Sequence, residues 1–192
     1  MTKKLILASS SPRRQELLQQ VNIPFSLRKQ GFDESQITTR DPVEKVEQLA
    51  IRKGRSVPFE HPDEVILSAD TVVSFQGKIF EKPGNQAEAA EMMRVLSGEV
   101  HEVYTGVMIR SQEDEVVIVE RTAVEFWPLT EEEINWYVST DEPYDKAGAY
   151  GIQSLGAMFV KQITGDYYNV VGLSISRVTR ELRRFSVYPE KG

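Results

Sequence analysis

The stretch ASSSPRR near the N-terminus places two adjacent arginines directly after a run of serines and a proline. Serine is typical of a helix N-cap and proline of the first helical residue, so we expect Ser11 to cap a helix that begins at Pro12. Arg13 and Arg14 then fall in the first turn, where the helix dipole disfavours each cation by about 0.3–1 kcal/mol. Hydroxyls such as Ser9, backbone N–H groups and guanidinium groups also bind phosphate oxygens. The stretch alone fits a phosphate site and a solvated turn equally well.

A lysine at the end of a predicted amphipathic helix is the next candidate. Lys53 lies three residues after Ala50 and four after Leu49, so it lies on the apolar stripe of its helix. Such a lysine commonly extends past the edge of a core into solvent, and the sequence alone slightly favours that interpretation. The alternative is a lysine whose ammonium group points into a cleft.

Two carboxylates have the chemistry of a catalytic or metal site. Asp70 ends the strongly apolar segment EVILSAD and is followed by Thr71. Residues at strand ends in α/β proteins often face a ligand crevice, although a carboxylate there could simply cap a turn. Glu34, in the loop sequence FDES, could supply a second carboxylate. Two carboxylates, water and a substrate phosphate are a common way of holding Mg²⁺.

Two later segments carry weaker signals. Lys82 precedes a proline, which holds its backbone extended, and a surface lysine is the default interpretation. The segment DKAGAYGIQ contains Gly148 and Gly151, which permit unusual backbone angles or a close approach to a ligand. Gln153 at its end offers a donor and an acceptor, which suits the edge of a nucleobase. Alone, this segment would be an ordinary glycine-rich loop.

The elements that must position these residues alternate irregularly along the chain. Cap residues and 3.6-residue periodicity predict helices, whereas alternation and short apolar runs predict strands and hairpins. We therefore expect an α/β fold with a central mixed β-sheet flanked by helices. The predicted strands are 4–8, 64–70, 101–111 and 115–127, with a short strand after residue 23. Three predicted helices begin at residues 12, 42 and 86, and two more span 130–138 and 176–185. Predicted hairpins turn at 76–77 and, within 157–173, near 165–166, and a long loop is predicted over 141–156.

Composition limits the function classes. The chain has 192 residues, 40% of them hydrophobic, which suits one domain over 1–192. Its formal net charge of −6 disfavours binding to nucleic acid or to an anionic membrane surface. It has no cysteine, which excludes disulfides and thiolate catalysis. No apolar run reaches membrane-spanning length, and the N-terminal one is too short for a signal-peptide core, so we expect a cytoplasmic protein.

Taken together, these segments resemble the Maf family of nucleoside triphosphate pyrophosphatases. The resemblance covers nearly the whole chain, with the motifs in the family's order, and the combination is specific although no single motif is. At one position, Ser174, many members have proline instead. The matching segments are ASSSPRR, FDE, LAIRKGR with Lys53, SADTVV, EKP, DKAGAYGIQ and GDYYNVVGL.

The resemblance implies two lobes around a deep cleft, frequent homodimers, and hydrolysis of a nucleoside triphosphate to the monophosphate and pyrophosphate with a divalent cation, Mg²⁺ or Mn²⁺. The form GIQ with paired arginines resembles the branch acting on dTTP and UTP, and some members are linked to inhibition of septum formation. The implied roles are catalysis for Asp70; substrate specificity for Arg13, Thr71 and Gln153; phosphate binding for Ser9, Ser11, Arg13, Arg14, Lys53 and Lys82; and metal binding for Glu34 and Asp70.

As a mechanism, we expect water to attack the α-phosphorus while the basic side chains neutralise the triphosphate. Asp70 would activate that water or hold the metal that does so. Of the two carboxylates, Glu34 is the one expected to act purely as a metal ligand. The strongest alternative is a nucleotide-binding regulator of cell division whose hydrolysis is slow or incidental. A nucleic-acid-binding module is a weaker alternative, because no basic stripe with interleaved aromatic residues is present.

Overall fold

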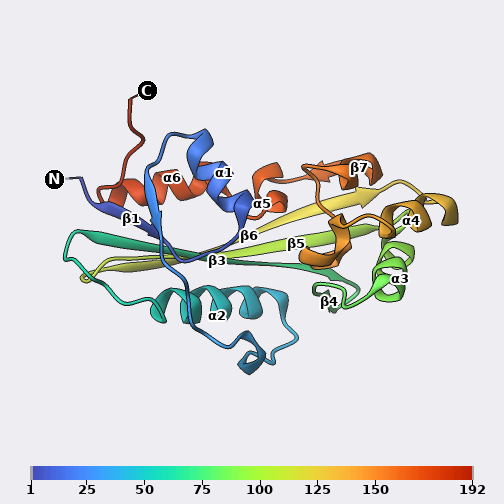
Figure 1. The fold of residues 1–192 in the computed structure, drawn as a ribbon, viewed down its shortest axis with the longest axis horizontal. Coiled ribbons are helices and arrows are strands. Elements are labelled where there is room, and N and C mark those ends of the chain that lie inside the picture. Colours follow the sequence, from blue (N-terminus) through green and yellow to red (C-terminus); the bar gives the residue numbers. More distant parts are fainter. Residues whose placement is uncertain (1, 192) are drawn as a thin grey trace.

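The computed structural model describes residues 2–191, which form a seven-stranded mixed sheet with helices on both faces (Figure 1). The strand order is β2-β1-β3-β5-β6-β7, and the short β4 pairs with β3. The β1 strand pairs in parallel with β2 and β3, whereas all other pairs are antiparallel. The α/β class and the mixed sheet predicted from the sequence are therefore confirmed. The strands are β1 Lys4–Leu7, β2 Phe25–Leu27, β3 Glu64–Phe75, β4 Lys78–Phe80, β5 Val100–Arg110, β6 Glu115–Phe126 and β7 Val160–Thr164.

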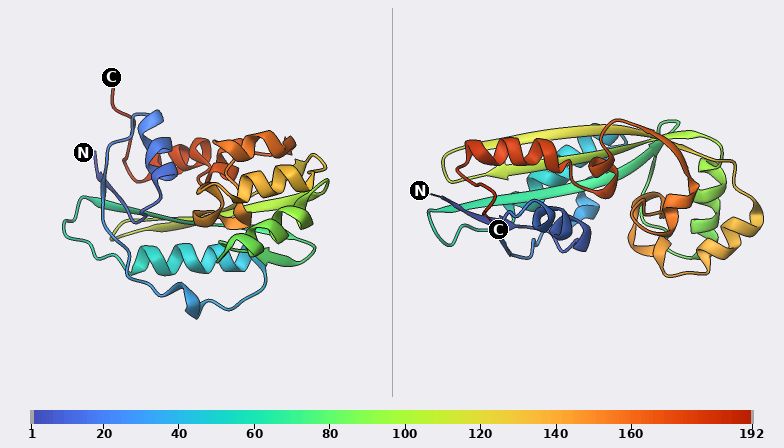
Figure 2. Two further views of the ribbon diagram at one scale, coloured as in Figure 1. Left: turned by 45° about the vertical axis from the view of Figure 1, so that its right-hand side comes forward. Right: turned by 90° about the horizontal axis from the view of Figure 1, so that it is seen from above.

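The helices divide between the faces of this sheet. Helix α2 covers one face, and α1, α5 and α6 lie on the opposite face (Figure 1). Helices α3 and α4 pack together near the far end of the long strands, which gives the molecule its second lobe (Figure 2). The bounds are α1 Pro12–Gln20, α2 Pro42–Arg55, α3 Gln86–Leu96, α4 Glu131–Val138, α5 Tyr167–Val171 and α6 Ile175–Arg184, with 3₁₀ turns at Glu34–Gln36, Glu142–Asp145, Ala147–Ala149 and Leu155–Phe159.

Strand β3 differs from the prediction in a way that matters for the site. It does not end at Asp70 but continues to Phe75, because Val72 and Val73 are buried and pair onward with β5 and β4. The partner on its other side is interrupted, since β1 pairs with β3 only as far as Leu67 and β4 starts pairing at Val73. In the part of the chain that the structure describes, one edge of β3 is thus without a strand partner around Asp70, and this gap opens the cleft.

The second predicted hairpin is wrong. Within residues 157–173, the end of a 3₁₀ turn is followed by β7 and then by the short helix α5, not by two strands paired with each other. The side chain of Asp166 accepts a hydrogen bond from Tyr168 N and caps the helix. Tyrosine and valine favour strands, so the cap together with the packing of α5 against β5 and β6 outweighs local propensity.

The main apolar core lies between the sheet and helices α1, α5 and α6, and it extends into the second lobe. On the opposite face α2 comes so close to the sheet that a Cβ on Gly106 would lie 2.3 Å from the carbonyl oxygen of Val46. Only glycine permits this approach of α2, whose residues Lys45, Leu49 and Lys53 line the cleft. His101 and Tyr150 belong to the core, where their side chains form a 2.6 Å hydrogen bond. Burial lowers the pKa of His101 to about 3 and keeps it neutral. Within residues 2–191, no helix combines the length and apolar character that a membrane crossing requires.

Candidate active site

A cleft of about 780 Å³ lies beside the interrupted edge of β3, and side chains from both lobes line it. Its volume is within the range of small-molecule sites. Every residue to which the sequence assigned a catalytic, specificity, phosphate or metal role lines this cleft, although those residues come from segments spread over more than 140 positions. They are Ser9, Ser11, Arg13, Arg14, Glu34, Lys53, Asp70, Thr71, Lys82 and Gln153.

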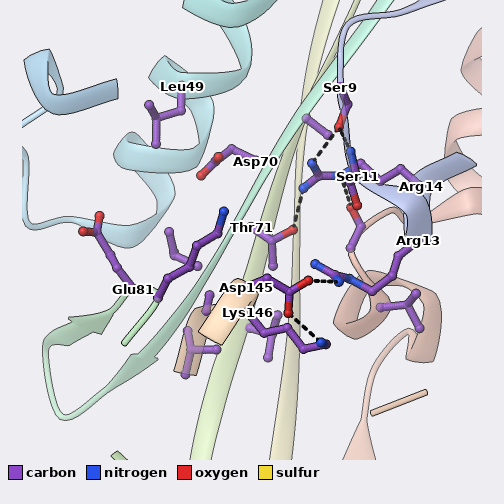
Figure 3. A pocket seen from close by; sticks show the side chains of 18 of the residues that line it. Ser9, Ser11, Arg13, Arg14, Leu49, Asp70, Thr71, Glu81, Asp145 and Lys146 are labelled. Atoms are coloured by element: carbon purple, nitrogen blue, oxygen red, sulfur yellow. Dashed lines mark hydrogen bonds and ion pairs between the residues drawn. The ribbon is translucent and has the colours of Figure 1, made fainter. Parts of the chain in front are cut away.

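The start of α1 forms one wall, as Figure 3 shows. Ser11 has extended backbone angles and precedes Pro12, as expected for a cap, but its own side chain makes no capping bond. The hydroxyl of Ser9 accepts a 3.2 Å hydrogen bond from Ser11 N and a 3.3 Å bond from Arg14 Nη1. Ser9 therefore fixes both the turn and an arginine.

Arg14 is held at three points of its guanidinium group. Besides its bond to Ser9, it donates from Nε to the carbonyl oxygen of Gly172 at 2.8 Å and from Nη2 to Thr71 Oγ1 at 3.1 Å. Burial lowers its pKa, opposed by Asp70, but an arginine stays charged at neutral pH. These acceptors offset the unfavourable helix dipole and fix the cation beside the cleft.

Arg13 is directed toward the second lobe and is held less tightly. Its Nη1 lies 3.4 Å from Oδ2 of Asp145, and Oδ1 of the same carboxylate accepts a 2.7 Å bond from Lys146 (Figure 3). The side chain of Asp145 is 63% exposed, so this ion pair is weak and screened by solvent. Arg13 can exchange Asp145 for an incoming anion at little cost.

Lys53 joins the two predicted carboxylates. Its Nζ lies 2.6 Å from Asp70 Oδ1 and 2.8 Å from Glu34 Oε1, and the residue is 8% exposed. The ammonium therefore points into the cleft and does not extend past the core into solvent. Burial raises the pKa of Asp70 above its ordinary value, and the charge of Lys53 opposes that rise.

The remaining predicted residues lie on other parts of the wall. Thr71 follows Asp70 on β3 and is tied to Arg14, whereas Lys82 and Gln153 are exposed residues of the second-lobe loops. The lining contains six basic side chains and four acidic ones, in a protein whose net charge is negative. They are Arg13, Arg14, Lys45, Lys53, Lys82 and Lys146, against Glu34, Glu81, Asp70 and Asp145. This is a local basic site suited to a multiply charged anion, with a buried carboxylate beside it.

The structure adds residues that the sequence did not single out. Lys146 lines the cleft and donates to the carbonyl oxygen of Glu142 at 3.0 Å, and its place in DKAGAYGIQ could have drawn attention to it. Lys45 and Glu81 form a 2.7 Å ion pair between α2 and the loop after β4. Thr105, hydrogen-bonded to Thr71, lies on a strand whose alternation gives no functional signal.

Comparison with protein families decides what kind of protein presents this cleft. A family model described as "Maf-like protein" matches residues 4–185, which is nearly the whole chain. The chain belongs to the Maf family. The similarity predicted from the motifs of the sequence is thereby confirmed, and the cleft lies within the part of the chain that the Maf family shares.

Relatives within the Maf family are similar over almost their full length. A dTTP/UTP pyrophosphatase of Bacillus mycoides is 51% identical over 183 residues, covering 95% of this chain and 96% of that protein. A protein of the same name from Bacillus cytotoxicus is also 51% identical with the same coverage. Among solved structures, a HAM1 protein from Coxiella burnetii matches with a TM-score of 0.54 at 12% identity, covering 96% of this chain and all of that one. This last similarity concerns the fold alone.

Proposed function

We propose that this protein hydrolyses dTTP and UTP to the nucleoside monophosphate and pyrophosphate. The observation that carries the proposal is the convergence of Arg14, Lys53 and Asp70 on one cleft. The similarity to two dTTP/UTP pyrophosphatases at 51% identity supports this choice of substrate.

The first task of such a site is to neutralise the triphosphate. Hydrogen bonds already hold Arg14 beside the cleft, and Lys53 faces the same space. Arg13 can release Asp145 and bind the phosphates instead. Lys82, together with the hydroxyls of Ser9 and Ser11, would add further contacts from both lobes. Fixed cations in a partly desolvated site stabilise developing phosphate charge without reorganising, which is usually the largest part of phosphoryl-transfer catalysis.

Asp70 is the residue we propose to activate water. Its side chain is 13% exposed, and burial raises its pKa toward values at which a carboxylate is a better base. Lys53 at 2.6 Å opposes this rise and so favours the charged form that can accept a proton. A proton of the attacking water would pass to Asp70 while the water oxygen bonds to the α-phosphorus. The bond between the α-phosphorus and the bridging oxygen breaks at the same time, and pyrophosphate leaves.

A divalent cation fits the donors present. Glu34 and Asp70 both contact one ammonium group, so the two carboxylates reach a common positive charge. Mg²⁺ is commonly bound through one or two carboxylates together with substrate phosphates and water. We propose that these two residues would hold Mg²⁺ or Mn²⁺, and that the ion would supply additional charge neutralisation on the phosphate oxygens.

Thr71 and Gln153 are the residues we propose to contact the base, together with Arg13. Thr71 offers a hydroxyl on the floor of the cleft, and Gln153 offers an amide on the second-lobe wall. A site whose buried polar groups pair with one base edge rejects a base that leaves them unpaired. We also propose a homodimer, which the family resemblance implies, and a cytoplasmic location, which is expected from the sequence.

Pyrophosphate release from a panel of nucleoside triphosphates, with Mg²⁺ or Mn²⁺ present, tests this function. We expect dTTP and UTP to give the highest kcat/KM and Asp70→Asn to lower it by about 10³-fold or more, as loss of a catalytic base does. An Asp70→Asn variant that is folded and hydrolyses dTTP at the wild-type rate would remove Asp70 from the chemistry. If the wild-type protein released no pyrophosphate from any of these triphosphates, the proposed function itself would be refuted.

A further inference from the structure

A chain of hydrogen bonds leads from the cleft into the core behind β3. Thr71 pairs directly with Thr105 across the β3–β5 ladder, and their hydroxyl oxygens lie 2.8 Å apart. Thr105 is fully buried, and its Oγ1 lies 3.1 Å from the carbonyl oxygen of Asn169 in α5. At the cleft end, Arg14 Nη2 lies 3.1 Å from Thr71 Oγ1.

The chemistry of its two ends fixes the direction of this chain. A carbonyl oxygen only accepts, so Thr105 donates its single hydroxyl proton to Asn169. A guanidinium group only donates, so Thr71 accepts from Arg14. Thr105 has no second proton, and the bond between the two threonines therefore uses the proton of Thr71. The hydroxyl of Thr71 keeps one lone pair and has no proton left for a ligand in the cleft.

We propose that Thr105 is a specificity-determining positioning residue, which keeps the Thr71 hydroxyl an acceptor and so makes the cleft favour a pyrimidine that carries a proton on N3. The inference rests on the proposed function and deepens it. On the base edges of uracil and thymine, N3–H is the donor, flanked by two carbonyl oxygens. Cytosine presents a lone pair at N3 instead, and two facing acceptors repel each other in a desolvated site.

The structure also shows why Thr105 is suited to this role. Its partner Asn169 is fixed in turn, because the side-chain amide of Asn169 donates to the carbonyl oxygen of Val103 at 3.1 Å and to Thr122 Oγ1 at 2.9 Å. Asn169 is fully buried. The acceptor that orients Thr105 therefore cannot turn away, and the polarity of the chain is preserved whether or not a ligand is bound.

The test compares Thr105→Val with Thr105→Ser by the ratio of kcat/KM for UTP to that for CTP. Valine has the shape of threonine and lacks the hydroxyl, so Thr71 regains a proton that it can donate to N3 of cytosine. We expect the ratio to fall about tenfold or more in Thr105→Val, as for one mispaired buried group. Thr105→Ser keeps the hydroxyl and should retain the wild-type ratio. A ratio within twofold of wild type in a folded Thr105→Val variant, or an equal fall in Thr105→Ser, would overturn the proposal.

Equilibrium binding separates this result from failure of the proposed function. The dissociation constants for UMP and CMP should show the same tenfold loss of preference in Thr105→Val, with the melting temperature confirming a folded protein. Absence of pyrophosphate release by the wild type would refute the function, but the ratio of the dissociation constants for UMP and CMP could still be measured. Unchanged UMP and CMP preference in Thr105→Val, alongside normal hydrolysis of UTP, would refute only the role of Thr105.

Discussion

The ammonium nitrogen of Lys53, on helix α2, lies 2.6 Å from a carboxylate oxygen of Asp70, on strand β3. The same nitrogen lies 2.8 Å from Glu34. This single cation opposes the rise that burial causes in the pKa of the proposed base, and it contacts both proposed metal ligands. It links the proposals about catalysis and about metal binding.

Replacing Lys53 should therefore affect both the rate and its pH dependence. We expect Lys53→Met to lower kcat/KM for dTTP by about 10²-fold or more, because a phosphate contact and the partner of Asp70 are both lost. Lys53→Arg keeps the charge and serves as the matched control, with a smaller loss. Steady-state kinetics between pH 5 and 9 would measure both effects.

The pH dependence of kcat/KM shows in which direction Lys53 shifts the pKa of Asp70. Asp70 must be deprotonated to accept a proton, so activity is lost as the pH falls through its pKa, which burial raises above the ordinary value. Removing the cation of Lys53 removes the effect that opposes burial, so the acidic limb should move to higher pH by about one unit or more. An acidic limb that stays in place in Lys53→Met would show that Asp70 is not the titrating base.

The exposed pair between Arg13 and Asp145 should contribute little by itself. We expect Asp145→Asn to change KM for UTP by less than about threefold, since exposed ion pairs are worth ~0–1 kcal/mol. Arg13→Ala should raise KM about tenfold or more, because the guanidinium then cannot reach the phosphates. If Asp145→Asn raised KM as much as Arg13→Ala, the carboxylate itself would be part of substrate binding.

Glu142 should control the loop that carries Gln153. Its carboxylate accepts 2.8 Å bonds from the backbone N–H groups of Leu155 and Gly156 and a 2.7 Å bond from the hydroxyl of Tyr137. We expect Glu142→Gln to speed amide hydrogen exchange at residues 155 and 156 about tenfold and to raise KM for both pyrimidine substrates, since one acceptor becomes a donor. Glu132→Gln, at an exposed position of α4, is the matched control. Unchanged exchange at both amides would contradict this role.

Glu64 should make stability depend on pH far from the cleft. Arg28 donates two hydrogen bonds to its carboxylate, at 2.7 and 2.9 Å, and holds its pKa near 2. Because this pKa lies below the unfolded value near 4.5, the stabilisation is complete above about pH 5 and disappears as the pH falls toward 2. Glu64→Gln should lower the free energy of unfolding at pH 7 by about 3 kcal/mol, and the difference from wild type should shrink below pH 5. Urea titrations would measure it.

A nearby glutamate provides the comparison for that stability measurement. Glu60 also pairs with Arg28, at 2.9 Å, but its side chain is 60% exposed. Glu60→Gln should change the free energy of unfolding by less than about 1 kcal/mol, as expected for an exposed ion pair. Equal effects of the two substitutions would mean that burial of Glu64 does not set the strength of its ion pair.

The sequence predicted most elements of the fold because their signals are local. Asp41, Asn85 and Thr130 each accept a hydrogen bond from a backbone N–H at the start of a helix, as their types and positions indicate. Gln76 and Gly77 turn the β3–β4 hairpin with positive φ angles, as the sequence there also indicates. Signals of this kind act within a few residues and need no knowledge of the rest of the chain.

The two errors in the fold and the missing site residues have a different origin. The passage of β3 through Asp70 depends on pairing with β5, and the helix after Asp166 depends on packing against the sheet. The contacts from Asp145 to Arg13 and from Thr105 to Thr71 join residues 132 and 34 positions apart. A single sequence contains the types of these residues but does not show that they meet.

Hydrolysis of UTP in ¹⁸O-labelled water shows which phosphorus atom the water attacks, because the label stays on that atom. Attack at the α-phosphorus, as proposed here, places the ¹⁸O in UMP and leaves the released pyrophosphate unlabelled. Phosphorus NMR or mass spectrometry of the separated products would show this, with Asp70→Asn as the inactive control. Label in the pyrophosphate, or release of inorganic phosphate and UDP, would mean that water attacks a different phosphorus and that the protein is not a pyrophosphatase of this kind.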